Sequence, residues 1–158
     1  MKEYKASKTA NFIDWVIGFL LTVFMGYLFA LITKQDIWSG IIKFVLLGII
    51  MDFVVLRKHF KRQIILKPHT IEFKSYHIDN AYRDAEIDFS SVTRIGKCFS
   101  FNIKGSALSI RTTAHKKDIL VDATMKDHKE LFSEICKKAR EHNPDVKISK
   151  KITEYLSE

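Results

Sequence analysis

Three ionisable residues, Asp14, Lys43 and Asp52, lie within two long apolar stretches near the start of this 158-residue chain. A charge in a hydrocarbon environment is costly, so such residues are functional candidates in membrane segments. Two carboxylates at the same depth can share a proton or hold a cation between them. Proton or cation handling is therefore one interpretation of Asp14 and Asp52, and hydration in the headgroup layer is the other. Lys43 lies within two turns of the end of its stretch, so its ammonium group can reach the interface.

The remaining reactive side chains do not form a recognisable site. The six histidines are scattered, with no pair three or four residues apart, and neither Cys98 nor Cys136 lies in a motif that lowers a thiol pKa. The chain has no glycine-rich phosphate loop and no nucleophile elbow. We therefore predict no catalytic residues, no metal site, no cofactor and no enzymatic activity.

The apolar stretches are long enough to position Asp14 and Asp52 inside a membrane. Residues 12–33 and 37–56 each provide about 20 residues, which as a helix cross a hydrocarbon core of roughly 30 Å. Only Lys34, Gln35 and Asp36 separate them. The sequence therefore predicts a transmembrane helical hairpin over residues 12–56.

Small residues recur every four positions in both predicted spans, which places them on one face of each helix. In an antiparallel hairpin, facing positions have a constant index sum, and one register pairs Gly18 with Gly48, Gly26 with Gly40, and Asp14 with Asp52. We expect close packing along these stripes, whose members are Gly18, Thr22, Gly26, Gly40 and Gly48.

Basic residues flank the hairpin on one side. Lys2, Lys5 and Lys8 precede the first span, and four more follow the second: Arg57, Lys58, Lys61 and Arg62. The positive-inside rule places both termini in the cytoplasm, with the hairpin in the cell (inner) membrane. We expect the four residues after the second span to contact anionic headgroups, at roughly 1 kcal/mol for each basic group near the surface.

The rest of the chain changes from helical to alternating periodicity. Apolar residues alternate with polar ones over 85–89 and 99–103, and short segments with closely spaced apolar residues occur at 64–66, 71–73, 108–112 and 119–123. Together they predict half-buried strands in an antiparallel sheet, curled or closed. Thr124, followed by an apolar stripe to Ala139, predicts a helix that ends at Asn143-Pro144. We therefore predict an α+β chain: a cytoplasmic N-terminus over 1–11, the hairpin, a domain over 57–144, and a short amphipathic tail over 145–158.

The segment from Ile87 to Ile95, Ile-Asp-Phe-Ser-Ser-Val-Thr-Arg-Ile, resembles a strand-then-turn element of bacterial PH-like domains in membrane proteins, including the YcxB-like group. The resemblance covers residues 57–142 and the order of hairpin and domain. It implies a PH-like antiparallel β-barrel or sheet capped by a C-terminal helix, acting as a membrane-tethered module without catalysis. Only Lys67 and Lys74 lie in the first hairpin of the domain, so inositide recognition is not carried over.

Charge and architecture leave two functional hypotheses. Much of the net charge of +8 borders the membrane, and residues 64–144 are nearly balanced, so we predict no nucleic-acid partner. The first hypothesis is a membrane-anchored adaptor or regulatory module that binds a protein or peptide at the inner membrane surface. The second is a small membrane component that acts through its hairpin, as a transporter or pore subunit or as an immunity or envelope-stress factor. Homo-oligomerisation is compatible with either.

Overall fold

A computed structural model describes residues 1–34, 36–59, 61–79, 81–100 and 105–157, except for the side chains of residues 50–59. The chain is α+β and divides into two compact units. Unit 1 comprises residues 1–7 and 61–158, and unit 2 comprises residues 8–60.

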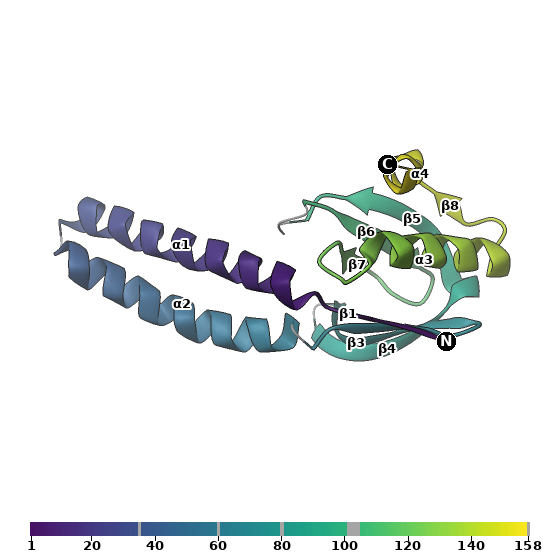
Figure 1. Ribbon diagram of the computed structural model, residues 1–158, viewed down its shortest axis with the longest axis horizontal. Coiled ribbons are helices and arrows are strands. Elements are labelled where there is room, and N and C mark those ends of the chain that lie inside the picture. The colour runs from purple at the N-terminus through teal and green to yellow at the C-terminus, as the bar shows by residue number, and fades with distance from the viewer. Residues whose placement is uncertain (35, 60, 80, 101–104, 158) are drawn as a thin grey trace. The chain divides into compact units, whose positions relative to one another are not determined.

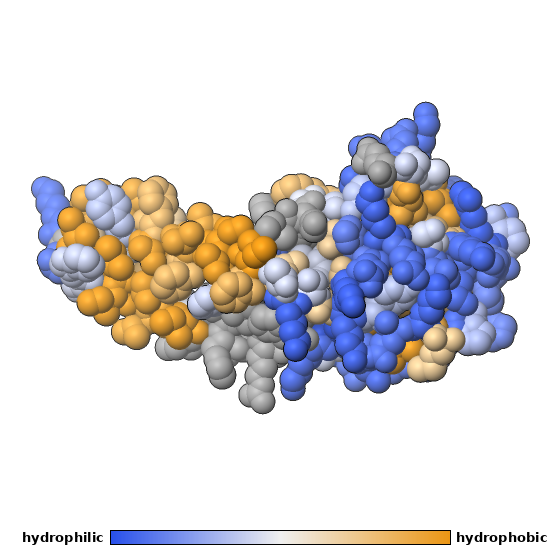
Figure 2. All heavy atoms as spheres, in the orientation of Figure 1, coloured by the Kyte–Doolittle hydropathy of each residue, from blue (hydrophilic) through white to orange (hydrophobic). Residues whose placement is uncertain are grey.

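Unit 2 is a pair of helices, α1 (Lys8–Thr33) and α2 (Ile37–His59). Among the described residues, α1 alone has the length and apolarity to cross a membrane, with a mean hydropathy of 2.3 in its most apolar window. A helix of this kind near the N-terminus is either a membrane span or a signal sequence. The described apolar part of α2, Ile37–Ile49, is shorter. Figure 2 shows the apolar surface gathered over these helices and the polar surface over unit 1.

Unit 1 contains two four-stranded sheets (Figure 1). The first has the order β1-β2-β3-β4, and all of its pairs are antiparallel. The second has the order β7-β6-β5-β8, in which only the short pair of β5 and β8 is parallel. The strands are β1 (Lys2–Lys5), β2 (Gln63–Leu66), β3 (Thr70–Ile78), β4 (Ala81–Asp88), β5 (Val92–Cys98), β6 (Ala107–Thr112), β7 (Ile119–Asp122) and β8 (Lys147–Ile148).

The sequence prediction of an antiparallel sheet is confirmed, whereas the described strands do not close into a barrel. The short 3₁₀ helix η1 (Phe89–Ser91) separates β4 from β5, and its N-cap Asp88 accepts a hydrogen bond from the Ser90 amide. This break ends the first sheet and starts the second. One hydrophobic core nevertheless serves both sheets, because inward residues such as Phe73 and Ile110 belong to one buried cluster.

Residues 1–7, which the sequence analysis places outside the domain, form part of unit 1. β1 pairs with β2, and Tyr4 is buried in the core. The amide of Ala6 donates to the Arg62 carbonyl at 3.1 Å, and that of Ser7 donates to the Thr124 carbonyl at 2.9 Å. In the sequence, the helical pair therefore lies between β1 and β2, two strands that are paired with each other in one sheet.

The C-terminal helix is confirmed, but it begins later than predicted. α3 (His128–His142) starts after Asp127, because the preceding residues are held by the N-terminal strand: the Lys126 amide donates to the Lys5 carbonyl at 2.9 Å. The predicted strand over 99–103 is only partly described. Val92–Cys98 forms β5, Phe99 and Ser100 follow it without strand structure, and 101–103 lie outside the described residues.

The last segment, predicted as a tail, is built into unit 1. β8 pairs with β5, and α4 (Lys150–Ser157) places Ile152 in the core with no exposed surface. The Ser149 amide donates to the Ile95 carbonyl at 2.9 Å. Tyr155 and Leu156 pack against the same core.

Candidate functional site

The small residues of the hairpin lie where the two helices approach most closely. A Cβ built on Gly40 would lie 2.6 Å from the Ala30 Cβ, and one on Gly48 would lie 2.7 Å from the Thr22 Cγ2. Such distances leave no room for any larger side chain. Gly26 is equally enclosed, because a Cβ there would lie 3.0 Å from the Phe44 Cβ.

The register agrees with the sequence pattern in part. Gly26 and Gly40 face each other, with the Gly26 carbonyl oxygen 3.1 Å from a Cβ built on Gly40. Gly48, however, lies against Thr22 and not against Gly18. No atom among the described residues comes within 4 Å of a Cβ built on Gly18. The stripes therefore meet about one helical turn away from the predicted pairing at this end.

The ionisable residues of the hairpin are only partly described. Asp14 is half-buried on α1, and Lys43 is exposed on α2. The side chains of Asp52, Arg57 and Lys58 lie outside the described residues, so the predicted meeting of Asp14 and Asp52 stays a prediction.

Of the four residues predicted to contact headgroups, Lys61 is exposed and Arg62 is not. The Arg62 side chain is only 7% exposed and forms an ion pair with Asp122, at the end of β7. Its guanidinium carbon also lies 5.9 Å from the centre of the Tyr76 ring. The headgroup prediction is therefore wrong for Arg62, because folding turns this cation into the interior of unit 1.

The Arg62 pair is the centre of a buried polar cluster that joins the two sheets. Ser100 Oγ donates to Asp122 Oδ1 at 2.8 Å, and Tyr76 Oη donates to Met125 Sδ at 3.2 Å. Burial raises the pKa of Tyr76 well above its ordinary range. The Arg62 side chain is buried and Asp122 is 18% exposed, and the contacts of the pair reach residues of both sheets, so this cluster contributes to the cohesion of unit 1.

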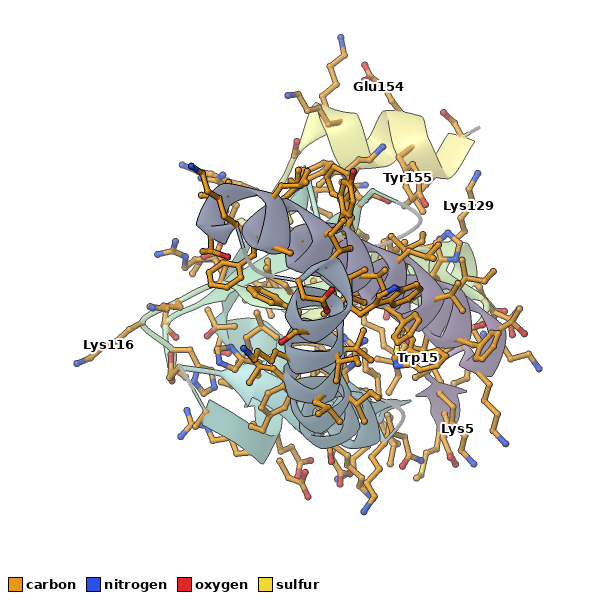
Figure 3. The ribbon with its side chains drawn as sticks, turned by 90° about the vertical axis from the view of Figure 1, so that its left-hand side faces the viewer. Lys5, Trp15, Lys116, Lys129, Glu154 and Tyr155 are labelled. Carbon is orange, nitrogen blue, oxygen red and sulfur yellow. The ribbon has the colours of Figure 1, made fainter. Side chains whose placement is uncertain are left out.

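A first surface hollow surrounds Tyr155 on α4, and Figure 3 labels this ring with Glu154 and Lys129. Lys97 Nζ lies 4.1 Å and Lys129 Nζ 5.3 Å from the centre of the Tyr155 ring. The Tyr155 hydroxyl and His128 Nε2 are 2.9 Å apart. This Tyr155 pocket encloses about 370 Å³, and its lining comprises Lys97, Cys98, Phe99, Gly105, Lys151, Glu154 and Tyr155.

The excess of lysines makes the Tyr155 pocket suitable for an anionic group beside an aromatic surface. Sequence reasoning did not find it, since Lys97 and Lys151 are 54 positions apart. The one available signal was the amphipathic spacing of Ile148, Ile152 and Tyr155, which is compatible with either a docked or a frayed helix.

A second hollow, the α3–α4 groove, has an apolar floor and a basic rim. It also encloses about 370 Å³, and its lining comprises Ser133, Cys136, Lys137, Arg140, Glu141, Ile148, Ile152, Thr153 and Leu156. Burial raises the pKa of Cys136 to about 11, so this thiol stays protonated and unreactive at neutral pH. The groove can therefore accept apolar side chains but has no activated nucleophile at Cys136.

Two histidines that are far apart in the sequence come together in the fold. His69 Nδ1 and His142 Nε2 are 3.0 Å apart, and His142 Nδ1 lies 2.9 Å from the Lys138 carbonyl oxygen. Across the part of the chain that the structure describes, no three His, Cys, Asp or Glu side chains gather to hold a metal ion.

The chain was also compared with known proteins. No protein-family model, no curated protein and no solved structure matches it.

Proposed function

We propose that this chain is a non-catalytic adaptor, anchored in the inner membrane by a two-span hairpin, with a PH-like domain in the cytoplasm that binds a protein or peptide. The pairing of β1 with β2 carries this proposal. β1 precedes the apolar helices and β2 follows them, yet both belong to one sheet. If α1 crosses the membrane, α2 must return the chain to the same side for this sheet to form.

The same pairing argues against a cleaved signal sequence. Removing α1 by cleavage would also remove β1 and expose the core around Tyr4. The basic residues on both sides of the hairpin then favour a cytoplasmic location for the folded unit. Antiparallel sheets followed by a C-terminal helix agree with what the PH-like resemblance implies for this part of the chain.

The α3–α4 groove is the best candidate for partner binding. Ile148 and Leu156 offer apolar surface, and Lys137 and Arg140 on its rim favour acidic residues beside the apolar ones. We expect the partner to be a short protein segment with this composition.

The experiment is site-specific photo-crosslinking of the full chain in native membranes. A photoreactive residue at Arg140 should give a discrete crosslinked partner, whereas one at Lys116, exposed on the β6–β7 loop, should not. The groove assignment fails if both positions give the same products or if Arg140 gives none.

The second candidate, a pore or transporter component acting through the hairpin, rests on Asp14 and Asp52. Gly26, Gly40 and Gly48 are already in contact within the hairpin, which leaves less of the small-residue surface for assembly with other helices. Replacing both aspartates with asparagine separates the proposals. The phenotype is that of cells lacking this protein, and the variant is tested for its ability to correct it. If the variant still crosslinks the partner and corrects the phenotype, the hairpin is an anchor. If it crosslinks the partner but does not correct the phenotype, the hairpin is the active element.

A further inference from the structure

One end of unit 1 is tied to the helical pair at two points. Lys8, the first residue of α1, directly follows Ser7, and a single residue separates the last residue of α2, His59, from Lys61. The two crossing points are adjacent, because the Ala6 amide donates to the Arg62 carbonyl. A residue spans at most about 3.6 Å, so this end cannot move far from the base of the hairpin.

The predicted spans start at residue 12 and end at residue 56, so only four and three helical residues lie outside them. At about 1.5 Å per residue, these add roughly 6 Å to the path. If the hairpin spans the membrane as proposed, this end of unit 1 therefore lies at the headgroup layer.

Phe99 belongs to this end of unit 1. It follows the last residue of β5, and its neighbour Ser100 donates to Asp122, the partner of Arg62. The chain just after Asp122 also meets the N-terminal segment, where the Ser7 amide donates to the Thr124 carbonyl. The Phe99 side chain is 70% exposed, whereas Phe73, Phe89 and Phe132 in the same unit are buried.

Two lysines lie in the same pocket lining as Phe99. Lys97 and Lys151 line the Tyr155 pocket together with Phe99, and the acidic residue of the lining is Glu154. Phenylalanine is among the apolar residues that membrane-surface segments bury at the boundary of headgroups and acyl chains, and lysines near that boundary are attracted to anionic lipids. An exposed phenylalanine beside two lysines, at the end that carries the hairpin, has the composition of a membrane-contacting surface.

We propose that Phe99, Lys97 and Lys151 contact the anionic headgroup layer of the bilayer that holds the hairpin. This inference rests on the proposed membrane anchoring and deepens it. The contact is a third attachment point, since the two chain crossings alone leave the domain free to tilt. It fixes which face of unit 1 points toward the cytoplasm.

The test uses the full chain in phosphatidylcholine nanodiscs, with or without phosphatidylglycerol. Cys98 and Cys136 are replaced with alanine, and a polarity-sensitive fluorophore is attached at Phe99→Cys or at Asp145→Cys. Asp145 is an exposed control at the far end of β5, because its neighbour Asn143 donates from Nδ2 to the Val92 carbonyl at 2.8 Å. We expect blue-shifted emission and quenching by spin-labelled lipid at position 99 only, both stronger with phosphatidylglycerol.

Charge reversal checks the role of the lysines. Lys97→Glu with Lys151→Glu should abolish the dependence on phosphatidylglycerol, whereas Lys116→Glu with Lys117→Glu, in the β6–β7 loop, should leave it unchanged. Water-like emission at position 99 in both lipid compositions would overturn the proposal. A response to a polyglutamate peptide in detergent, without a response to lipid, would also overturn it and assign the pocket to an acidic protein segment.

Alkaline carbonate extraction separates this inference from the anchoring on which it rests. If the chain stays in the membrane while position 99 reports water, the anchor stands and the contact is wrong. If carbonate releases the chain, both the anchoring and the contact are wrong.

Discussion

Arg62 shows how one residue can change roles between sequence and structure. It ends a basic run next to an apolar stretch, a position typical of headgroup contact. The fold instead pairs it with Asp122, 60 residues further along the chain, and buries both side chains in large part. A buried ion pair is a weak net contributor to stability, but removing one partner leaves the other charge without compensation.

We therefore predict that Asp122→Ala destabilises unit 1 by about 3–5 kcal/mol, because it leaves the Arg62 guanidinium buried without its carboxylate. The measurement is hydrogen exchange of the β2 and β7 amides in the full chain. Arg111→Ala, which breaks an ion pair whose arginine side chain is 51% exposed, is the control and should cost about 0–1 kcal/mol. Equal effects of the two variants would show that burial does not matter here.

The lowered pKa of Asp79 indicates how the stability of unit 1 depends on pH. Its side chain accepts hydrogen bonds from His115 at 2.9 Å and Arg83 at 2.7 Å, and the His115 contact is the main cause that lowers the Asp79 pKa below its ordinary value of 3.8. Hydrogen bonds from Lys67 and Thr70 likewise lower the pKa of Glu86. A carboxyl group with a lowered pKa contributes stability that is complete above its unfolded value and is lost as pH falls through its folded value.

We accordingly expect the melting temperature of unit 1 to be steady near neutral pH and to fall below about pH 4. Asp79→Asn should lower the melting temperature at neutral pH and reduce its further fall in acid, because the variant has one fewer carboxylate to protonate. The measurement is a melting curve at several pH values. An unchanged acid profile in Asp79→Asn would mean that other carboxylates control the transition.

At the scale of elements, the helical pair depends on close backbone approach. Gly40 and Gly48 have no space for a side chain, since their built Cβ atoms would lie 2.6 Å and 2.7 Å from atoms of α1. The spacing that placed these glycines on one face was visible in the sequence. The pairing of Gly26 with Gly40 was visible as well, whereas Gly48 meets Thr22 and not Gly18, because a shift along the helix preserves the stripe and changes which residues meet.

We predict that Gly40→Leu separates α1 from α2 and costs about 1–3 kcal/mol, the usual range for overpacking. Gly18→Ala is the matched control, since a Cβ there meets no described atom within 4 Å, and it should be neutral or slightly stabilising. Disulfide crosslinking of cysteines introduced at Ala30 and Gly40 cannot measure this packing, because replacing these two residues changes the contact between the helices. Thermal unfolding of the detergent-solubilised chain, followed by helical circular dichroism, measures the difference. A larger loss for Gly18→Ala would contradict the observed packing.

At the scale of the whole molecule, the insertion of the helices between β1 and β2 links topology to folding. Unit 1 cannot complete its first sheet unless residues 2–5 and 63–66 are on one side of the membrane. If the helices cross the membrane as proposed, the chain must therefore cross it an even number of times between these two strands. The strand pairing requires only that both strands lie on the same side, and the distribution of basic residues favours the cytoplasmic side for the proposed arrangement.

We predict that single cysteines at Lys2 and at Asp145 resist a membrane-impermeant thiol reagent in intact cells and react after permeabilisation. A cysteine at Lys34, between the two helices, should react from outside. The background carries Cys98→Ala and Cys136→Ala, and labelling is measured by a gel shift. Different accessibility at positions 2 and 145 would contradict the β1–β2 pairing, and equal outside labelling of both would reverse the proposed orientation.

The sequence by itself determined the features that depend on neighbouring residues. An α+β chain, an apolar N-terminal helix, antiparallel strands and a C-terminal helix all follow from local periodicity, because side-chain direction repeats every 3.6 residues in a helix and every 2 in a strand. The docking of α4 was only suggested, by a short amphipathic spacing that does not identify its partner surface.

Only the tertiary structure decided which residues and strands that are far apart in the sequence contact each other. β1 pairs with a strand about 60 residues away, Arg62 is turned inward, and Tyr155 is placed between Lys97 and Lys129. None of these contacts has a local signal, because each joins residues that are far apart in the sequence and meet only after the chain has folded. The candidate surfaces on unit 1 were therefore hidden from sequence reasoning, whereas the apolar hairpin was not.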